Sequence, residues 1–348
     1  MWAEWSELVL DSVFQPDTTT ERIRALEANI FDHFDLEPIE RTIKVRHCHC
    51  SIHTVFFKAK HDVSNAPIVL IHGLAAGVTY WAPNIEELSQ EHDVYCFDIP
   101  GFGLSDRPDF SSDETIAELE MVSCFEDWRR EMKLERMHMI AHSLGAFFAS
   151  SYALEHPNRV IQLILLEPLL FAEKQNVSTK QVKPRGYMHA IGKITPYFTP
   201  FFLLRCAGPF ASRLMASVRP DIRSKYQKKG KDANDDFYEC IALCNSRYPS
   251  GEHMYMNLVF PNGFAKRPMS KRFCGMDEDI KTTFIFGSKS FIDSRPAVEI
   301  QNQRNDVGLH FLRQGGHSVN VDVLADFNQL VLRLLKDDSS THESEASI

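Results

Sequence analysis

The chain has 348 residues and a hydrophobic fraction of 44%, which fits a soluble globular protein with one large domain plus an insertion, or with two domains. It contains no run of about 18 uncharged apolar residues, so no transmembrane helix is expected, and the acidic residues 1–14 argue against a secretory signal peptide. The net charge of −9 argues against nucleic acid as a partner. Eight cysteines in this length predict a reduced, cytosolic protein without a disulfide framework.

The first residues have a tryptophan-containing pattern with near-helical spacing. Trp2, Trp5, Val9 and Phe14 recur among acidic residues. Such a segment could lie in a lipid interface, or it could be a terminal helix that packs its aromatic side chains on the domain. Both readings stay open for residues 1–19.

A helix capped by Thr20 is predicted next, followed by two alternating strands over residues 40–45 and 51–57 that form a hairpin. The connection, residues 46–50, has the sequence Arg-His-Cys-His-Cys, and its histidines and cysteines are residue types that bind metal ions. In an extended strand, however, Cys48 and Cys50 face one way while His47 and His49 face the other. The spacing therefore predicts a structural segment, with no metal and no cofactor.

Strands and helices alternate from residue 67 to residue 167, which is typical of a doubly wound, mostly parallel α/β sheet. This alternation of strands and helices stops at residue 169 and returns near residue 277. We therefore expect a hydrolase-type core over residues 20–168 and 277–335, a helical cap over 169–276, and a disordered acidic tail over 336–348. Between Leu169 and Phe273 the chain has 18 Lys+Arg and 7 Asp+Glu, so the predicted cap carries +11 while the remainder carries −20.

The sequence Ala-His-Ser-Leu-Gly around Ser143 has the pattern of a nucleophile elbow. A short apolar strand precedes it and a small-residue helix follows, as the sharp turn under a nucleophilic serine requires. An earlier strand runs into His72-Gly73-Leu74, a second loop of small residues. The backbone amides of Leu74 and Leu144 are the predicted oxyanion-hole donors.

A nucleophilic serine needs a histidine base and a carboxylate that orients this base. His317 follows two glycines after a late strand, and Asp293 follows the strand before it, which gives the chain order serine, acid, histidine. Glu167, at the end of another strand, competes with Asp293 for the role of acid. Asp322 forms an H-x-x-x-x-D pattern with His317 that also occurs in glycerolipid acyltransferases, but two common residues carry little information.

The chain resembles the α/β-hydrolase-domain subfamily that contains the co-activator of adipose triglyceride lipase and the N-acyl phosphatidylethanolamine lipase. The resemblance extends from about residue 23 to residue 334, nearly the whole chain. The motifs that carry it include Gly101-Phe102-Gly103, Leu204 to Phe210, Arg219-Pro220-Asp221, Pro249 to Glu252, Ala265 to Met269, and Phe286-Gly287 with Ile292-Asp293.

The resemblance implies an α/β-hydrolase fold and a lipid-related function. In this subfamily the lipase branch has serine at the elbow, whereas the vertebrate co-activator has asparagine; this chain has Ser143. It departs from the subfamily pattern at Ala75-Ala76, which replace a glycine pair, at Leu169-Leu170, which replace Trp-Gly, and at Ala141, which replaces the first elbow glycine.

The sequence thus predicts a serine ester hydrolase of the lipase or lysophospholipase type, acting on acyl glycerophospholipids, with Ser143, His317 and Asp293 as its triad. The alternatives are a lipid-droplet co-activator of a triglyceride lipase and, with less support, a lysophosphatidic acid acyltransferase. A cytoplasmic protein held peripherally at droplets or internal membranes is expected. The candidate residues for contact with lipid are Trp2, Trp5, Arg219, Lys266 and Arg267.

Overall fold

A computed structural model describes residues 16–61, 65–173, 199–228 and 235–345. Its centre is an eight-stranded sheet with the strand order β1-β2-β4-β3-β5-β6-β7-β8, in which β2 pairs antiparallel with β1 and β4 and all other pairs are parallel. The mostly parallel α/β sheet predicted from the alternating pattern is therefore confirmed. The strands are β1 Ile39–Lys44, β2 Ser51–Phe57, β3 Ile68–Ile71, β4 Val94–Phe97, β5 Met137–His142, β6 Val160–Leu166, β7 Lys281–Gly287 and β8 Val307–Leu312.

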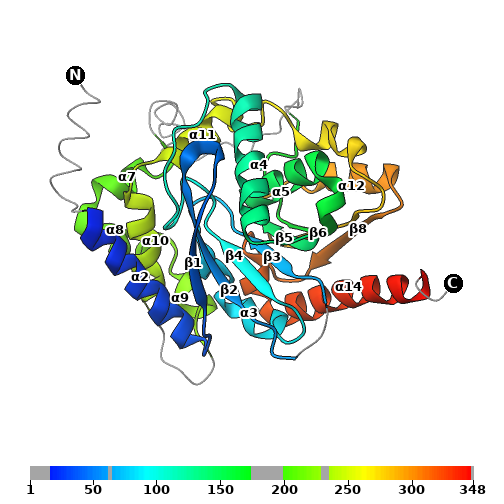
Figure 1. The fold of residues 1–348 in the computed structure, drawn as a ribbon. Helices are drawn as coiled ribbons and strands as arrows, with labels where there is room; N and C mark the ends of the chain where they lie inside the picture. The colour runs from blue at the N-terminus through cyan, green and yellow to red at the C-terminus, as the bar shows by residue number, and fades with distance from the viewer. Residues whose placement is uncertain (1–15, 62–64, 174–198, 229–234, 346–348) are drawn as a thin grey trace.

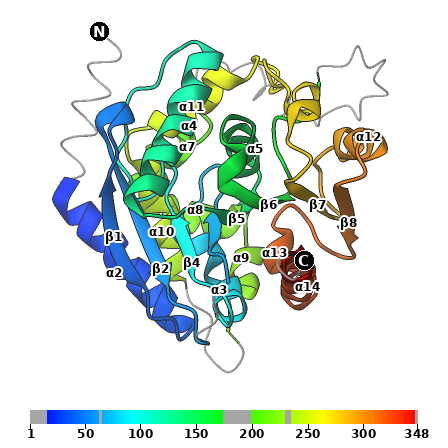
Figure 2. The ribbon, with the colours of Figure 1, turned by 45° about the vertical axis from the view of Figure 1, so that its right-hand side comes forward.

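Helices cover both faces of the sheet, as Figures 1 and 2 show. The central strands are apolar along their whole length because a parallel sheet is buried on both sides. One hydrophobic cluster joins the sheet to α4, α5 and α12, and another joins it to α2, α3 and α14. The core helices are α2 Pro16–His33, α3 Ala82–Leu88, α4 Glu114–Glu131, α5 Leu144–Glu155, α12 Arg295–Gln303, α13 Val319–Asp322 and α14 Leu324–Glu345.

Helices also fill the described part of the segment between β6 and β7. In Figure 1, α8, α9 and α10 lie beside α2, whereas α11 packs against α4, and Arg22 of α2 pairs with Glu239 at 2.7 Å. Inside this segment, a buried ion pair joins Arg205 to Glu252. These helices are α7 Phe202–Cys206, α8 Ala211–Val218, α9 Asp221–Lys225, α10 Asp236–Ser246 and α11 Ser250–Leu258.

Two local predictions differ from the structure. The connection between β1 and β2 is a short 3-10 turn at His47–His49, not an extended strand, and Cys48 has a φ of 58°. Asp127 of α4 stabilises this turn by accepting both the Arg46 and His47 amides at 2.9 Å. Helix α2 begins at Pro16, so Thr20, the predicted cap, lies inside the helix. The disorder of the tail over residues 336–348 stays a prediction. No helix in the described part of the chain is long and apolar enough to cross a membrane.

Candidate active site

Ser143 lies at the sharp turn between β5 and α5. Its φ of 54° and ψ of −116° are unusual for a residue with a side chain, and such strain is typical of a nucleophile elbow. The turn is held by the Ser143 amide, which donates to the Leu166 carbonyl of the neighbouring strand at 2.9 Å. Gly145 is required here because a Cβ at its position would lie 2.3 Å from the carbonyl oxygen of His72. The strand, turn and helix predicted around Ser143 are therefore present.

The predicted oxyanion loop packs directly against the elbow. A Cβ on Gly73 would lie 2.8 Å from the Cβ of Ser143, so only glycine allows this approach. His72 fixes the base of the loop, with Nδ1 2.7 Å from the Gly73 carbonyl and Nε2 accepting the Ile99 amide at 2.9 Å. Burial lowers the pKa of His72 to about 4, so its ring is neutral near pH 7. Within the described residues, the amides of Leu74 and Leu144 donate no backbone hydrogen bond, which leaves both available.

Asn245 holds the same loop from the opposite side. Its Nδ2 donates to the Ala75 carbonyl at 2.9 Å, and the Asn245 carbonyl in turn accepts from Arg205 at 3.1 Å. Since Arg205 is paired with buried Glu252, a continuous polar network links α7, α10 and α11 to the loop that carries Leu74. Sequence analysis missed Asn245 because nothing in its local pattern points to a loop 170 residues away.

Ala75 occupies a backbone conformation that suits glycine. Its φ is 64°, and Leu170 has the same value. The resemblance implies glycine at both positions, so two of the three departures noted in the sequence each place a side chain in the left-handed region. The energetic cost is of the order of 1 kcal/mol per residue.

We therefore expect Ala75→Gly to stabilise the protein by about 0.5–1 kcal/mol, which raises the melting temperature by about 1–2 °C in a chain of this size. Ala76→Gly is the matched control, because Ala76 does not have a positive φ. This control should lower the melting temperature through the extra freedom of the unfolded chain. Equal shifts for both variants in a calorimetric scan would contradict a strained Ala75.

His317, the predicted base, lies beside the elbow with its side chain 27% exposed. Its ring packs between Phe291 and His142, with centroid distances of 4.8 and 4.7 Å. His142 also bonds the His317 carbonyl through Nε2 at 2.8 Å, and burial holds the pKa of His142 well below its usual value. A neutral His142 next to Ser143 therefore positions the His317 backbone without adding charge. Sequence analysis did not identify this role of His142.

The structure brings Glu167, and not Asp293, to His317. Oε2 of the fully buried Glu167 lies 3.9 Å from Nδ1 of His317, and the described part of the chain places no other carboxylate within ion-pair distance. The Asp293 carboxylate instead forms a two-pronged pair with Arg295 at 2.7 and 2.9 Å. Hydrogen bonding to Arg295 lowers the pKa of Asp293, despite partial burial. Glu167 is therefore the candidate acid that approaches the His317 ring, whereas the Asp293 carboxylate faces Arg295.

Glu167 is held in place by the loop after β7. Its two oxygens accept the Gly287 amide and the Ser290 hydroxyl. Glu167 itself has a φ of 48°, an uncommon conformation that aims its side chain along this edge of the sheet. Nδ1 of His317 is buried and makes no hydrogen bond, so a small movement would complete the pair, and long contacts of this kind are common in ligand-free sites.

Asp322 holds the loop that carries His317. Its Oδ2 accepts the Gly316 amide at 2.7 Å, and its Oδ1 lies 2.6 Å from Nζ of Lys225 on α9. A cavity of about 470 Å³ adjoins this pair and is also lined by Lys289. The carboxylate of the H-x-x-x-x-D pattern is therefore engaged as a structural link between α9 and the histidine loop.

Of the five candidate residues for lipid contact, the structure describes three, and each of these is paired with a carboxylate. Trp2 and Trp5 lie outside the described residues. Arg219 pairs with Asp221 at 2.9 Å, Lys266 with Glu114 at 3.7 Å, and Arg267 with buried Glu118 at 3.1 Å. Much of the positive charge counted from sequence is thus neutralised by nearby carboxylates.

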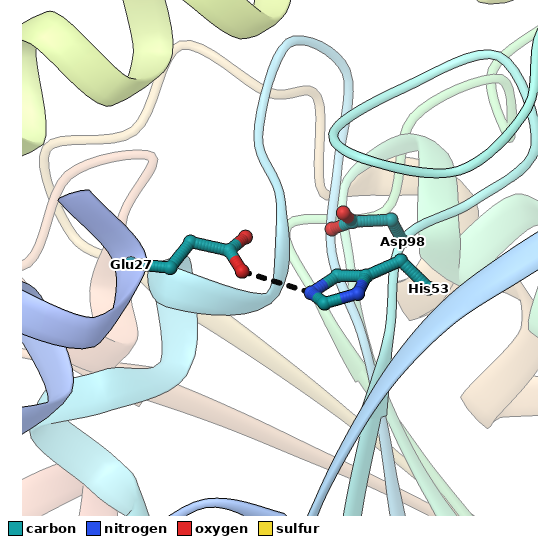
Figure 3. Close-up of side chains that lie close together, drawn as sticks. All are labelled: Glu27, His53 and Asp98. Atoms are coloured by element: carbon teal, nitrogen blue, oxygen red, sulfur yellow. Dashed lines mark hydrogen bonds and ion pairs between the residues drawn. The ribbon is translucent and has the colours of Figure 1, made fainter. Parts of the chain in front are cut away.

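A buried charged cluster lies away from the elbow. Figure 3 shows Glu27 and Asp98 near His53, and their potential ligand atoms lie within 4.8 Å of one another. These groups are already occupied, because Nε2 of His53 bonds Glu27 at 2.8 Å while the Asp98 oxygens accept the Val78 and Leu104 amides. Burial opposes charge on His53, but Glu27 outweighs it and raises the His53 pKa. The cluster therefore ties α2 to the sheet.

Comparison with known proteins agrees with this architecture. A family model described as the alpha/beta hydrolase fold matches residues 66–322. The naproxen esterase of Bacillus subtilis has a TM-score of 0.62 at 16% identity, covering 90% of this chain and 96% of that one, which shows a shared fold.

Three curated relatives are closer in sequence. The abhydrolase domain-containing protein lid-1 of Caenorhabditis elegans is 38% identical over 90% of this chain and 88% of its own length. The human 1-acylglycerol-3-phosphate O-acyltransferase ABHD5 is 39% identical over 79% of each chain. The human (lyso)-N-acylphosphatidylethanolamine lipase is 31% identical over 90% of this chain and 91% of its own. The chain therefore belongs to the α/β-hydrolase fold family, in the subfamily that includes ABHD5 and the (lyso)-N-acylphosphatidylethanolamine lipase.

Proposed function

We propose that the protein is a serine ester hydrolase that acts on acyl glycerophospholipids. The observation that carries this proposal is Ser143 at a strained elbow, flanked by the His317 loop and by the amides of Leu74 and Leu144. A serine hydroxyl, an imidazole and two inward amides are the groups that acyl transfer to water requires.

The reaction follows from these positions. Oγ of Ser143 attacks the acyl carbonyl carbon while His317 removes the hydroxyl proton, and the Leu74 and Leu144 amides bind the oxyanion. Collapse of the tetrahedral intermediate breaks the ester bond, and His317 gives its proton to the departing alcohol. Water, deprotonated by His317, then attacks the acyl-serine. Collapse of this second tetrahedral intermediate releases the fatty acid, and His317 returns its proton to Oγ of Ser143.

We assign orientation of His317 to Glu167 in place of Asp293. Burial at 0% exposure keeps water away from Glu167, so its interaction with an imidazolium is weakly screened. Asp293 is one-third exposed and neutralised by Arg295. Glu167 is therefore the carboxylate best placed to stabilise the charged form of His317.

The substrate class is inferred from relatives and from charge. One relative is named as a lipase of N-acylated phosphatidylethanolamine, whose phosphate is anionic. Lys289, which has no carboxylate partner in the described part of the chain, lines the cavity beside the histidine loop. Basic side chains near the site would favour a lipid with a phosphate headgroup. Peripheral attachment to a lipid droplet or internal membrane follows from such a substrate.

Labelling with a fluorophosphonate probe tests the nucleophile. We expect the wild-type protein to be labelled at Ser143, as located by peptide mapping, and Ser143→Ala to remain unlabelled. Probe on another residue, or a folded wild type that stays unlabelled, would overturn the hydrolase proposal. Ser112→Ala, which changes an exposed serine, is the control that should label normally.

A co-activator function, in which the protein stimulates a partner triglyceride lipase, is the second candidate, because ABHD5 is 39% identical to this chain and the (lyso)-N-acylphosphatidylethanolamine lipase 31%. Acyl transfer to a lysophospholipid, suggested by the name of ABHD5, has less support since Asp322 is engaged with Lys225 and Gly316.

A further inference from the structure

Helix α8 exposes an apolar stripe to solvent. Phe210, immediately before the helix, and Leu214 and Val218 within it are spaced four residues apart and are 63%, 38% and 65% exposed. Residues at this spacing lie on one face of a helix. The neighbouring face is the buried one, because Ala211 and Met215, each one residue further along the helix, pack into a small cluster with α7 and α10. The stripe is therefore not the buried side of an amphipathic helix.

Helix α7 extends this stripe into a larger surface. Leu203 is 70% exposed and Phe202 36% exposed, and α7 packs against α8 at the same edge of the molecule in Figure 1. We call these five residues the α7–α8 apolar face. They are five of the fourteen large hydrophobic side chains that are exposed in the described part of the chain, gathered within 17 residues. Such a concentration marks an interaction surface.

The charge around this face identifies what it would contact. Among the described residues 199–220, Arg205 pairs with Glu252 and Arg219 with Asp221, whereas the exposed Arg213 has no carboxylate partner in this part of the chain. On the face itself, the Arg213 guanidinium lies 5.9 Å from the centre of the Phe210 ring. Its aliphatic stem can lie along apolar surface while its charge reaches outward. An exposed apolar stripe that carries an arginine without a described carboxylate partner matches a lipid surface with anionic headgroups.

We propose that the α7–α8 apolar face docks the protein onto anionic phospholipid membranes. Leu203, Phe210 and Val218 enter the boundary between headgroups and acyl chains, and Arg213 contacts the phosphates. This contact replaces Arg219, Lys266 and Arg267 as the membrane-facing feature, because those three side chains are paired with carboxylates. The proposal does not depend on catalysis by Ser143.

Vesicle co-sedimentation tests the surface. The triple variant Phe210→Ser, Leu214→Ser, Val218→Ser should bind vesicles of phosphatidylcholine with 30% phosphatidylserine at least about tenfold more weakly than the wild type. The matched control, Ile116→Ser with Leu119→Ser, changes two exposed apolar residues of α4 and should bind like the wild type. Unchanged binding of the triple variant, or no binding of the wild type, would overturn the proposal.

The charge contribution has its own variant. Arg213→Glu should weaken binding to the anionic vesicles while leaving the weak binding to pure phosphatidylcholine unchanged. Equal loss on both vesicle types would contradict a role in headgroup recognition. The triple variant and Arg213→Glu should both keep the fluorophosphonate labelling of the wild type in solution. Loss of labelling in a variant alone would indicate misfolding, whereas absence of labelling in the wild type would count against the hydrolase proposal and not against the docking surface.

A fluorescent probe reports the docked orientation without changing the stripe. Cys206 on α7 and Cys274 are both exposed. An environment-sensitive fluorophore on Cys206, in a Cys274→Ser background, should shift to shorter wavelength with anionic vesicles, whereas the same fluorophore on Cys274 in Cys206→Ser should not. Equal shifts at the two positions would exclude the α7–α8 apolar face as the specific contact.

Discussion

Ser143→Ala is expected to lower ester hydrolysis by about 10⁴- to 10⁶-fold, because the variant retains the oxyanion amides and the binding surface but has no nucleophile. Release of fatty acid from lysophosphatidylethanolamine micelles measures this loss. The melting temperature should change little, since Ser143 donates its amide, and not its side chain, to the hydrogen bond that holds the turn.

The same variant distinguishes the two candidate functions. If the protein is a hydrolase, lipid turnover collapses in Ser143→Ala. If it acts as a co-activator, Ser143→Ala still stimulates triglyceride breakdown when mixed with a partner lipase. Turnover by Ser143→Ala within tenfold of the wild-type rate would contradict the proposed chemistry, and Ser112→Ala provides the control for substitution of a serine elsewhere.

Glu167→Gln should reduce the turnover number by about 10²- to 10⁴-fold, whereas Asp293→Asn should reduce it by less than about tenfold. Glutamine removes the negative charge that stabilises the imidazolium of His317, and its amide group would face the Gly287 and Ser290 donors. Asparagine at position 293 disturbs an exposed pair with Arg295. Initial rates with a soluble p-nitrophenyl ester measure both effects independently of membrane binding.

Arg295→Ala is the control for this comparison, because it frees the Asp293 carboxylate without altering it. The rate should stay close to that of the wild type if Glu167 orients His317. The reverse order of effects, with Asp293→Asn far slower than Glu167→Gln, would establish Asp293 as the acid and would mean that it leaves Arg295 when substrate binds.

Several features of the site follow from local sequence. The elbow at Ser143 is specified by a strand, a turn of small residues and a helix that are contiguous in the chain, so the pattern predicts its geometry directly. His317 and the loop containing Leu74 could be predicted in the same way, since each follows a buried strand. The sheet itself followed from the alternation of apolar strands and helices between residues 67 and 167.

The contacts between distant segments could not be read in this way. Glu167 and Asp293 each follow a strand, and the two strands β6 and β7 are neighbours in the sheet, so the sequence left both carboxylates as candidates. The pairing of Asp293 with Arg295, and the bonds from Gly287 and Ser290 to Glu167, depend on side-chain geometry. Neither Asn245 nor His142 has a local pattern that reveals its partner.

The sequence by itself determined the fold class and the candidates for nucleophile and base, because each depends on residues that are adjacent in the chain. Only the tertiary structure decided which acid faces His317, and that Arg219, Lys266 and Arg267 are paired with carboxylates. The same holds for the α7–α8 apolar face, because helical periodicity indicates which residues share a face but not whether that face is buried. Packing against α10 settles this by covering Ala211 and Met215 and leaving Phe210, Leu214 and Val218 exposed.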